Sequence, residues 1–250
     1  MRRLIVTADD AGLHPGMTAG AIRAHQDGIV TACSIVANGV AFDDAVDRLR
    51  DVPLLEVGVH LTLVEERPLT AMRFPDKYTS FVPLYLARRI SLGAIERELR
   101  AQVERVLGTG LPVTHLNGHQ HLHLLPRIFA VVARMAEEYR IPYVRIVNER
   151  PRERRLAKAA LSALGRRARG SFTNDRTIGV GIAGHLADAV PLLDEVEGLT
   201  ELVTHPGLGV TGYDWGYTWE AETRALCAAG LRNELASRGI ELVAPSKAFS

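Results

Sequence analysis

A run of nine residues, His115 to His123, reads HLNGHQHLH and holds four of the nine histidines in the chain. Protonated imidazoles repel one another at such spacing, so a cluster of this kind is most useful where something binds it. A second cluster, the carboxylate pair Asp9 and Asp10, follows the apolar stretch LIVTA near the N-terminus. Imidazoles and carboxylates together are ligands of zinc and other divalent metals. These residue types predict a metal centre if the fold brings them together.

Apolar segments that are typical of buried strands alternate along the chain with amphipathic segments that are typical of helices. We expect strands over 4–8, 29–38, 55–63, 112–117, 142–147, 177–184, 200–207 and 240–245. We expect helices over 15–28, 41–50, 92–107, 126–140, 152–168, 185–195 and 218–238. Strand cores this continuously apolar indicate a parallel sheet that is covered on both faces.

The alternation therefore predicts an α/β fold, a distorted (β/α) barrel with seven or eight parallel strands, in a single domain over 1–250. Residues 64–90 interrupt the alternation of strand and helix segments. We expect them to form a long loop at the carboxyl ends of the strands, where barrels place substrate contacts.

The carboxyl ends of barrel strands share one face, and active sites form there. Polar residues fall at these ends of the predicted strands: Asp9, Asp10, His60, His119, Arg145 and His205. A lone strand histidine is more often structural, and an aspartate pair is equally typical of a turn or a helix cap. Their convergence on one face favours a ligand set of Asp10, His60 and His119 that leaves positions open for water and substrate.

A metal beside a carboxylate favours hydrolysis by a metal-bound water, because the ion acidifies the water and polarises a carbonyl. We expect Asp10 to bind the metal and Asp9 to accept the proton of the water. Arg145 is expected to pair with Asp9 and keep it ionised. His205 is expected to protonate the leaving nitrogen, although a histidine that ends a strand before a turn is an equally good interpretation of it.

The remaining members of the histidine run have supporting roles in this interpretation. Strand alternation places His115 and Asn117 on the side to which His119 points, and Gly118 would allow a close approach or a turn of the backbone. We interpret His121 and His123 as residues that orient ligands, line the pocket or pack in the following loop.

The charge, the cysteines and the N-terminal stretch restrict the classes of partner and the cellular location that we expect. The formal charge of +1 argues against general attraction to nucleic acid, and the two cysteines belong to no CxxC pattern, which indicates free thiols. The apolar N-terminal stretch is too short for a signal peptide or a membrane span, so we expect a cytoplasmic protein. A homodimer is a common default for enzymes of this size.

Four motifs, in this order and at these spacings, resemble the YdjC/ChbG-like carbohydrate deacetylases: LIVTADDAGL, GVHLTLVEERPLTAM, PVTHLNGHQHLHLLPRIF and ELVTHPG. The resemblance covers most of the chain. It implies a barrel related to polysaccharide deacetylases and removal of the N-acetyl group from amino sugars with a divalent metal. It also implies Asp10, His60 and His119 as metal ligands, Asp9 as the base and His205 as the acid. The family is commonly described with Mg²⁺, whereas two imidazoles and a carboxylate also suit Zn²⁺.

The chain departs from the family pattern at two places. Ala11 stands where the family usually has phenylalanine, and NGHQHLH replaces the frequent DSHQHVH, so that Asn117 takes the place of an aspartate. The loss of this charge beside the ligands would affect the choice of metal or the tautomer of a ligand. The ligand residues themselves are retained.

Within this family, the segments HLNGHQHLH and RIVNERPRERR most resemble the HpnK branch, which is associated with hopanoid biosynthesis. This resemblance implies an N-acetylglucosaminyl hopanoid substrate. The segment 150–169 places Leu156, Ala160, Ala163 and Leu164 on one stripe among arginines, which is compatible with contact to an anionic membrane at the inner face. An ordinary barrel helix with a basic solvated face is the favoured interpretation of the stripe. Two alternatives to sugar deacetylation remain: hydrolysis of another small amide or ester, and sugar binding without catalysis.

Overall fold

The computed structural model describes residues 2–150 and 156–249, and for residues 156–159 it describes the backbone alone. Its strands are β1 (Arg2–Ala11), β2 (Ala32–Ile35), β3 (Glu56–Leu61), β4 (Val113–Gly118), β5 (Tyr143–Val144), β6 (Arg176–Ile178), β7 (Leu199–Thr204) and β8 (Ile240–Leu242). Its α-helices are α1 (Pro15–Gln26), α2 (Phe42–Arg50), α3 (Tyr78–Leu86), α4 (Leu92–Leu107), α5 (Ile128–Glu138), α6 (Leu156–Arg167), α7 (Trp219–Leu226) and α8 (Leu231–Ser237). Among the described residues, no helix is both long and apolar enough to cross a membrane.

All strand pairs in the sheet are parallel, in the order β5-β4-β3-β2-β1-β7-β6, and β8 joins β1 at its N-terminal end. The sheet curls so that its two outer strands approach each other. A single bridge between Val144 and Thr173 and a hydrogen bond from the Thr177 N–H to the Asn148 carbonyl (3.1 Å) connect these edges. The predicted distorted barrel of parallel strands is therefore confirmed.

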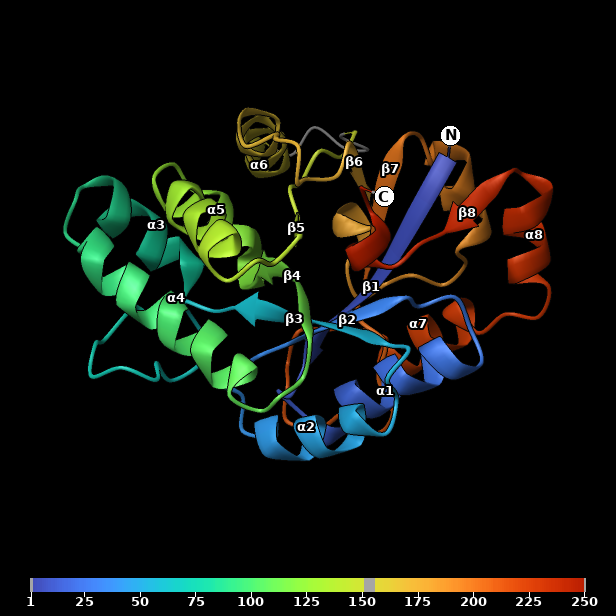
Figure 1. Ribbon diagram of the computed structural model, residues 1–250, viewed down its shortest axis with the longest axis horizontal. Coiled ribbons are helices and arrows are strands. Elements are labelled where there is room, and N and C mark those ends of the chain that lie inside the picture. Colours follow the sequence, from blue (N-terminus) through green and yellow to red (C-terminus); the bar gives the residue numbers. More distant parts are fainter. Residues whose placement is uncertain (1, 151–155, 250) are drawn as a thin grey trace.

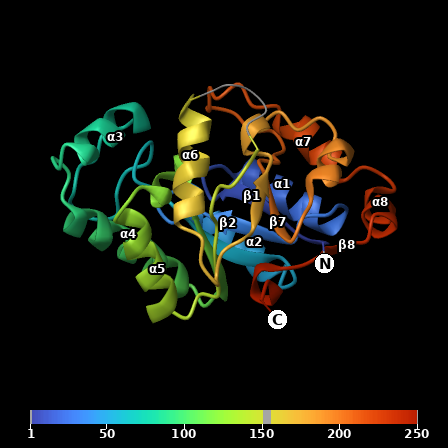
Figure 2. The same ribbon diagram turned by 90° about the horizontal axis from the view of Figure 1, so that it is seen from above.

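The helices surround the sheet, with α3, α4 and α5 on one flank and α1, α2 and α7 on another (Figure 1). Each buries an apolar stripe, as α4 does with the predicted residues Ile95, Leu99, Val103 and Val106. Seen from above, α6 lies over the middle of the barrel, between α3 and α7 (Figure 2).

The structure differs from the predicted elements at several places. The strand expected over 142–147 is only the two residues Tyr143–Val144 of β5. The supposed loop 64–90 contains the helix α3, which is short and has Pro83 inside it. The helix predicted over 218–238 is two helices, α7 and α8, because Gly230 adopts a left-handed conformation (φ 82°) at the start of α8. The segment 185–195 holds a short 3₁₀ turn, Val190–Glu195, in place of an α-helix, and the strand expected over 177–184 ends at Ile178.

The basic helix predicted over 152–168 is present as α6, and its expected residues 152–155 lie outside the described part. Its buried side differs from the predicted stripe. Ser162 is buried and donates to the Glu149 carbonyl (3.1 Å), and Gly165 packs so closely on the Val147 carbonyl that a Cβ there would lie 1.9 Å from the oxygen. Ala160 and Leu164 of the stripe, with Leu161, line a cavity. Among the described side chains of α6, Ala160, Leu161 and Leu164 thus face the interior of the barrel mouth.

Candidate active site

A bulge in β1 brings both aspartates into one site. Between the pairs Ala8–Cys33 and Ala11–Ile35, Asp9 and Asp10 together oppose Ser34, and Asp10 has the left-handed φ of 69°. In a regular strand neighbouring side chains point to opposite faces, whereas a bulge redirects one of them. Asp9 and Asp10 are each 2% exposed and both line the cavity at the carboxyl ends of the strands.

Hydrogen bonds fix the tautomer of His60, near the end of β3. The Asn117 amide nitrogen donates to Asp9 Oδ1 and lies equally close to Ser34 Oγ (both 3.0 Å), so the amide oxygen faces His60 Nδ1 (2.8 Å). Because that oxygen accepts only, Nδ1 must carry the proton. His60 Nε2 therefore presents a lone pair, 3.3 Å from Asp10 Oδ1.

His119 begins the 3₁₀ turn η1 (His119–Leu124), directly after β4. Gly118 allows this placement, because a Cβ at that position would lie 2.7 Å from the ring of His123. The next two residues, Gln120 and His121, have left-handed φ values of 51° and 53°. The ring of His119 lies between two carboxylates, with Nδ1 3.3 Å from Asp10 Oδ1 and Nε2 3.0 Å from Glu65 Oε2.

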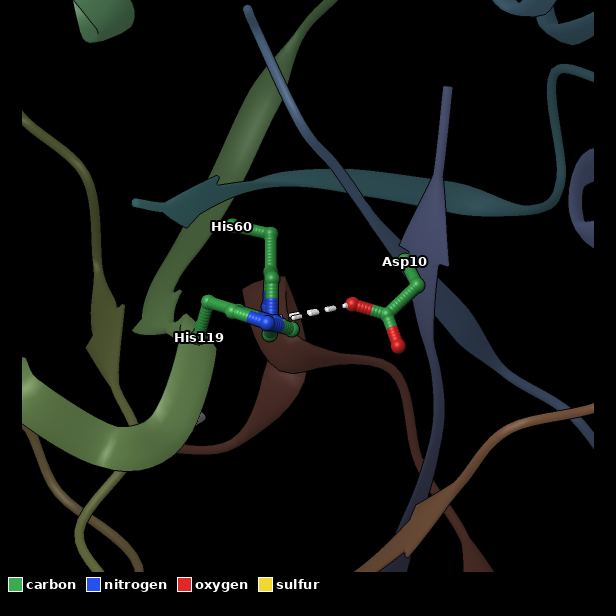
Figure 3. A group of neighbouring side chains, drawn as sticks. All are labelled: Asp10, His60 and His119. Carbon is green, nitrogen blue, oxygen red and sulfur yellow. Dashed lines mark ion pairs between the residues drawn. The ribbon is translucent and has the colours of Figure 1, made fainter. Parts of the chain in front are cut away.

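Asp10, His60 and His119 converge with ligand atoms that all lie within 4.8 Å of one another (Figure 3). Asp10 Oδ1 is buried and has no hydrogen-bond partner among the described residues. Burial disfavours the charged forms, yet contact with Asp10 and Glu65 raises the pKa of His119 to about 10, and the imidazoles lower the pKa of Asp10. Acceptor atoms this close require a proton or a cation between them. The donor set therefore fits a divalent metal.

The expected ion pair between Asp9 and Arg145 is present and fully buried. Arg145 Nη1 and Nη2 donate to the two carboxylate oxygens of Asp9 (2.5 and 2.9 Å). Burial alone would raise the pKa of Asp9, but the charge of Arg145 and the nearby His60 hold this pKa far below its usual value. Asp9 therefore stays ionised.

A second carboxylate shares the guanidinium of Arg145. Glu201, in β7, accepts from Arg145 Nη2 (2.8 Å), from the Tyr143 hydroxyl (2.5 Å) and from Thr7 (2.6 Å). Every one of these side chains is buried. Two carboxylates share one guanidinium, and the hydroxyls of Thr7 and Tyr143 donate to Glu201, so this buried network fixes the place of Asp9. Arg145 Nε is the one nitrogen of this guanidinium without a partner among the described residues.

His205 follows β7 and faces the same cavity. Its Nε2 is 3.9 Å from Asp10 Oδ2, and its ring packs against Tyr217 with centroids 5.1 Å apart. Its backbone N–H donates to Glu222 Oε1 (2.7 Å), which holds the chain in place as it leaves the strand.

The other members of the histidine run separate in the structure. His115 is buried beneath Gly58, away from the cavity lining, and burial lowers its pKa to about 3. His123 is also buried, and its Nε2 donates to the carbonyl of Arg145 (2.9 Å). His121 lines the cavity. Asn117 contacts both Asp9 and His60, so it connects the two halves of the site.

The cavity has a volume of about 790 Å³ and two kinds of wall. One wall carries the polar groups described above. The other is apolar and is formed by α3, η1, α6 and the chain after β6, with Val82, Pro83, Leu122, Leu125, Leu161, Leu164 and Val180.

The comparisons with known proteins place the chain in a family. The family model described as YdjC-like protein matches residues 3–237. The chain belongs to the YdjC-like family. It is 31% identical to a carbohydrate deacetylase from Brevibacillus brevis over 259 aligned residues, which cover 96% of this chain and 97% of that protein.

Solved structures show the same fold as this YdjC-like chain. A protein from Enterococcus faecalis, assigned provisionally to cellobiose-phosphate cleavage, has a TM-score of 0.75 at 24% identity and 98% coverage of both chains. The T48 deacetylase, solved with substrate, has a TM-score of 0.52 at 16% identity, with 99% of this chain and 90% of that chain covered. The predicted relation to deacetylase barrels is confirmed at the level of fold.

Sequence reasoning missed several groups at the site of this YdjC-like protein. Ser34, Glu65 and Glu201 contact Asp9, His119 and Arg145 respectively. A charged residue inside the apolar strand ELVT was a usable signal for Glu201. Four aromatic residues at alternate positions have rings that contact one another in sequence: Tyr213, Trp215, Tyr217 and Trp219. The Trp215 ring lies 5.6 Å from that of His119.

Proposed function

We propose that the protein is a metal-dependent hydrolase that removes the N-acetyl group from an amino sugar. Membership of the YdjC-like family and the similarity to a named carbohydrate deacetylase support this activity. The observation that carries the metal requirement is the convergence of one ligand atom each from Asp10, His60 and His119 within 4.8 Å of one another, with Asp10 Oδ1 buried and without a hydrogen-bond partner among the described residues.

A divalent ion bound by Asp10, His60 and His119 would lower the pKa of a water to near neutrality and polarise the acetyl carbonyl. In the proposed reaction Asp9 accepts a proton from the attacking water as the bond to the carbonyl carbon forms. His205 donates a proton to the sugar nitrogen as the C–N bond breaks. The products are acetate and the free amine.

Arg145 acts on this reaction through Asp9. It keeps the carboxylate ionised and holds it in one orientation by a bidentate contact, which fixes the direction from which a proton can be taken. Asn117 supports His60 and Asp9, and His123 donates to the backbone carbonyl of Arg145. His121 remains our candidate for a substrate contact.

The apolar wall of the cavity favours a substrate whose sugar carries an apolar group. A free oligosaccharide would leave the side chains of Val82, Leu161 and Leu164 in contact with water. A lipid-linked N-acetyl sugar, such as the N-acetylglucosaminyl hopanoid of the HpnK branch, would cover them. Burying an apolar side chain contributes about 1.5–3 kcal/mol, which is enough to discriminate between such substrates.

Peripheral membrane contact through segment 150–169 is a related proposal. Ala160, Leu161 and Leu164 of α6 line the cavity, and Arg166 and Arg167 at its C-terminal end are exposed. A basic surface beside the mouth of the cavity would hold that mouth near an anionic bilayer. Failure of anionic liposomes to retain the protein at low salt would exclude this contact. A cytoplasmic location and a homodimer stay predictions.

The test of the proposed function is acetate release from a panel of N-acetylated sugars, free and lipid-linked, with Mg²⁺ or Zn²⁺ supplied to the chelator-treated protein. We expect activity on at least one N-acetyl sugar, loss of activity on chelation and recovery on adding metal. Activity that is unaffected by chelation would contradict the metal requirement. Cleavage of simple esters or amides without cleavage of any N-acetyl sugar would favour the alternative hydrolase.

A further inference from the structure

The two imidazoles at the candidate metal site are supported by different groups. His60 donates its Nδ1 proton to a neutral amide oxygen, that of Asn117. His119 has a carboxylate in the equivalent place, because its Nε2 lies 3.0 Å from Glu65 Oε2. A neutral imidazole carries one proton. If that proton lies on Nε2 and is donated to Glu65, then Nδ1 presents its lone pair toward Asp10.

The loop that carries Glu65 is built to hold this contact. The Glu65 N–H donates to the Asp76 carbonyl (3.0 Å), and the second carboxylate oxygen accepts from the Gln120 side chain (3.2 Å). The Glu65 side chain is only 26% exposed. Both oxygens and the backbone are therefore committed to one arrangement.

Backbone strain is concentrated on both sides of the contact. Seven described non-glycine residues have a positive φ, and four of them belong to the site: Asp10, Glu65, Gln120 and His121. Such conformations are costly for residues with a Cβ and persist where the surroundings determine them. A fortuitous surface contact would not require strained residues in both partner segments.

We propose that Glu65 is a positioning residue that fixes the tautomer and orientation of His119 and thereby tightens binding of the divalent metal. The inference rests on the proposed metal-dependent function. A carboxylate behind a ligating imidazole raises the basicity of the ligand, and removing such a partner typically weakens metal affinity 10- to 100-fold. Nothing in the sequence motifs assigns this role to Glu65, which stands in the predicted long loop.

The neighbouring Glu66 provides a matched control. It is half-buried and close enough to His119 to interact with it electrostatically, but the structure gives it no hydrogen bond to that ring. Glu66→Gln removes the same charge from the same loop and leaves the contact in place. If the charge of the loop alone determined metal affinity, Glu65→Gln and Glu66→Gln would weaken it equally. If the contact with His119 determines it, only Glu65→Gln would weaken it.

The experiment measures Zn²⁺ affinity by competition with a chromophoric chelator, using the full-length metal-stripped protein and its Glu65→Gln, Glu65→Ala and Glu66→Gln variants. We expect Zn²⁺ affinity to fall about tenfold in Glu65→Gln and up to about 100-fold in Glu65→Ala, and to change less than about threefold in Glu66→Gln. Thermal unfolding of the metal-free proteins identifies any variant that fails to fold, and the isosteric glutamine keeps the test available if alanine is not tolerated.

The outcomes separate the two proposals. If wild-type protein binds no Zn²⁺, the proposed metal-dependent function fails. If wild-type protein binds Zn²⁺ and the Glu65 variants bind as tightly as Glu66→Gln, the positioning role of Glu65 is overturned while the metal site stands. A selective loss in the Glu65 variants supports both.

Discussion

Arg145 donates hydrogen bonds to both carboxylate oxygens of Asp9, at 2.5 and 2.9 Å. The guanidinium is fully buried, and Asp9 is 2% exposed. A buried charge pair of this kind is strongly destabilised when one partner is removed. Here Glu201 offers the guanidinium a second partner. The arrangement allows Asp9 to be neutralised without leaving Arg145 uncompensated, which makes its role in catalysis accessible to mutation.

The Asp9→Asn variant tests the proposed base. Because asparagine cannot accept the proton of the attacking water, we expect kcat to fall about 10²- to 10⁴-fold. Zn²⁺ affinity should remain within a few-fold of wild type, since Asp9 is not among the three convergent ligands. Steady-state acetate release measures the first quantity and chelator competition the second. Unchanged kcat in a metal-loaded variant would rule Asp9 out as the base.

The hydroxyl of Tyr143 is expected to stabilise the buried network rather than the reaction. It donates to Glu201 inside the barrel, so Tyr143→Phe leaves a buried carboxylate oxygen short of a donor and should lower the free energy of unfolding by about 1–3 kcal/mol. Tyr139→Phe is the matched control, because its hydroxyl donates to Glu104 at an exposed site. There we expect about 0.5 kcal/mol or less. Equal effects in the two variants, measured by urea unfolding, would show that burial of the network contributes nothing.

The buried His115 predicts a loss of stability in acid. Its folded pKa is lowered to about 3 by burial and by Arg145, against about 6.5 when unfolded, so the unfolded state binds more protons between these values. Stability from this group is therefore present above pH 6.5 and decreases as the pH falls toward 3. From pH 7 to pH 5 the loss is about 2 kcal/mol.

The measurement for His115 is denaturant unfolding of wild-type protein and His115→Leu at pH 7 and pH 5. Leucine has a similar size and does not titrate, so the difference between the two pH values should be smaller in the variant by about 2 kcal/mol. A pH dependence that is identical in the two proteins would show that His115 is not held neutral.

The apolar wall of the cavity should discriminate between substrates. Leu164→Glu places a charge where an apolar aglycone would lie, and we expect kcat/KM for a lipid-linked N-acetyl sugar to fall about 10- to 100-fold while that for a short soluble sugar changes little. Val40→Glu, at an 88% exposed site outside the lining, is the control. Equal losses on both substrate types would argue against recognition of an apolar group.

The alternation of strand and helix segments was sufficient to predict the barrel, because apolar strand segments such as LIVTA of β1 recur between amphipathic helices and parallel strands place their carboxyl ends on one face. The local geometry of the site was not predictable in this way. Alternation alone would point Asp9 and Asp10 to opposite faces, and the bulge opposite Ser34 that unites them has no marker in LIVTADD. The left-handed turn at Gln120 is likewise imposed by tertiary contacts, since glutamine has no preference for that conformation.

The roles of α6 and of the long loop also depended on tertiary packing. The arginine-rich helix has apolar residues on more than one side, and the sequence does not reveal that Gly165 must approach Val147 and so turn Leu161 and Leu164 toward the cavity. Glu65 lies about 54 residues from His119 in sequence, so their contact follows only from the adjacent positions of β3 and β4 in the sheet.

The most direct test of the metal centre is an anomalous difference map from crystals of the protein soaked with Zn²⁺. We predict a peak about 2.0–2.2 Å from His60 Nε2, His119 Nδ1 and a carboxylate oxygen of Asp10, with Glu65 on the far side of the His119 ring. A peak at any other group of residues, or coordination through His119 Nε2 with Glu65 displaced, would contradict the account.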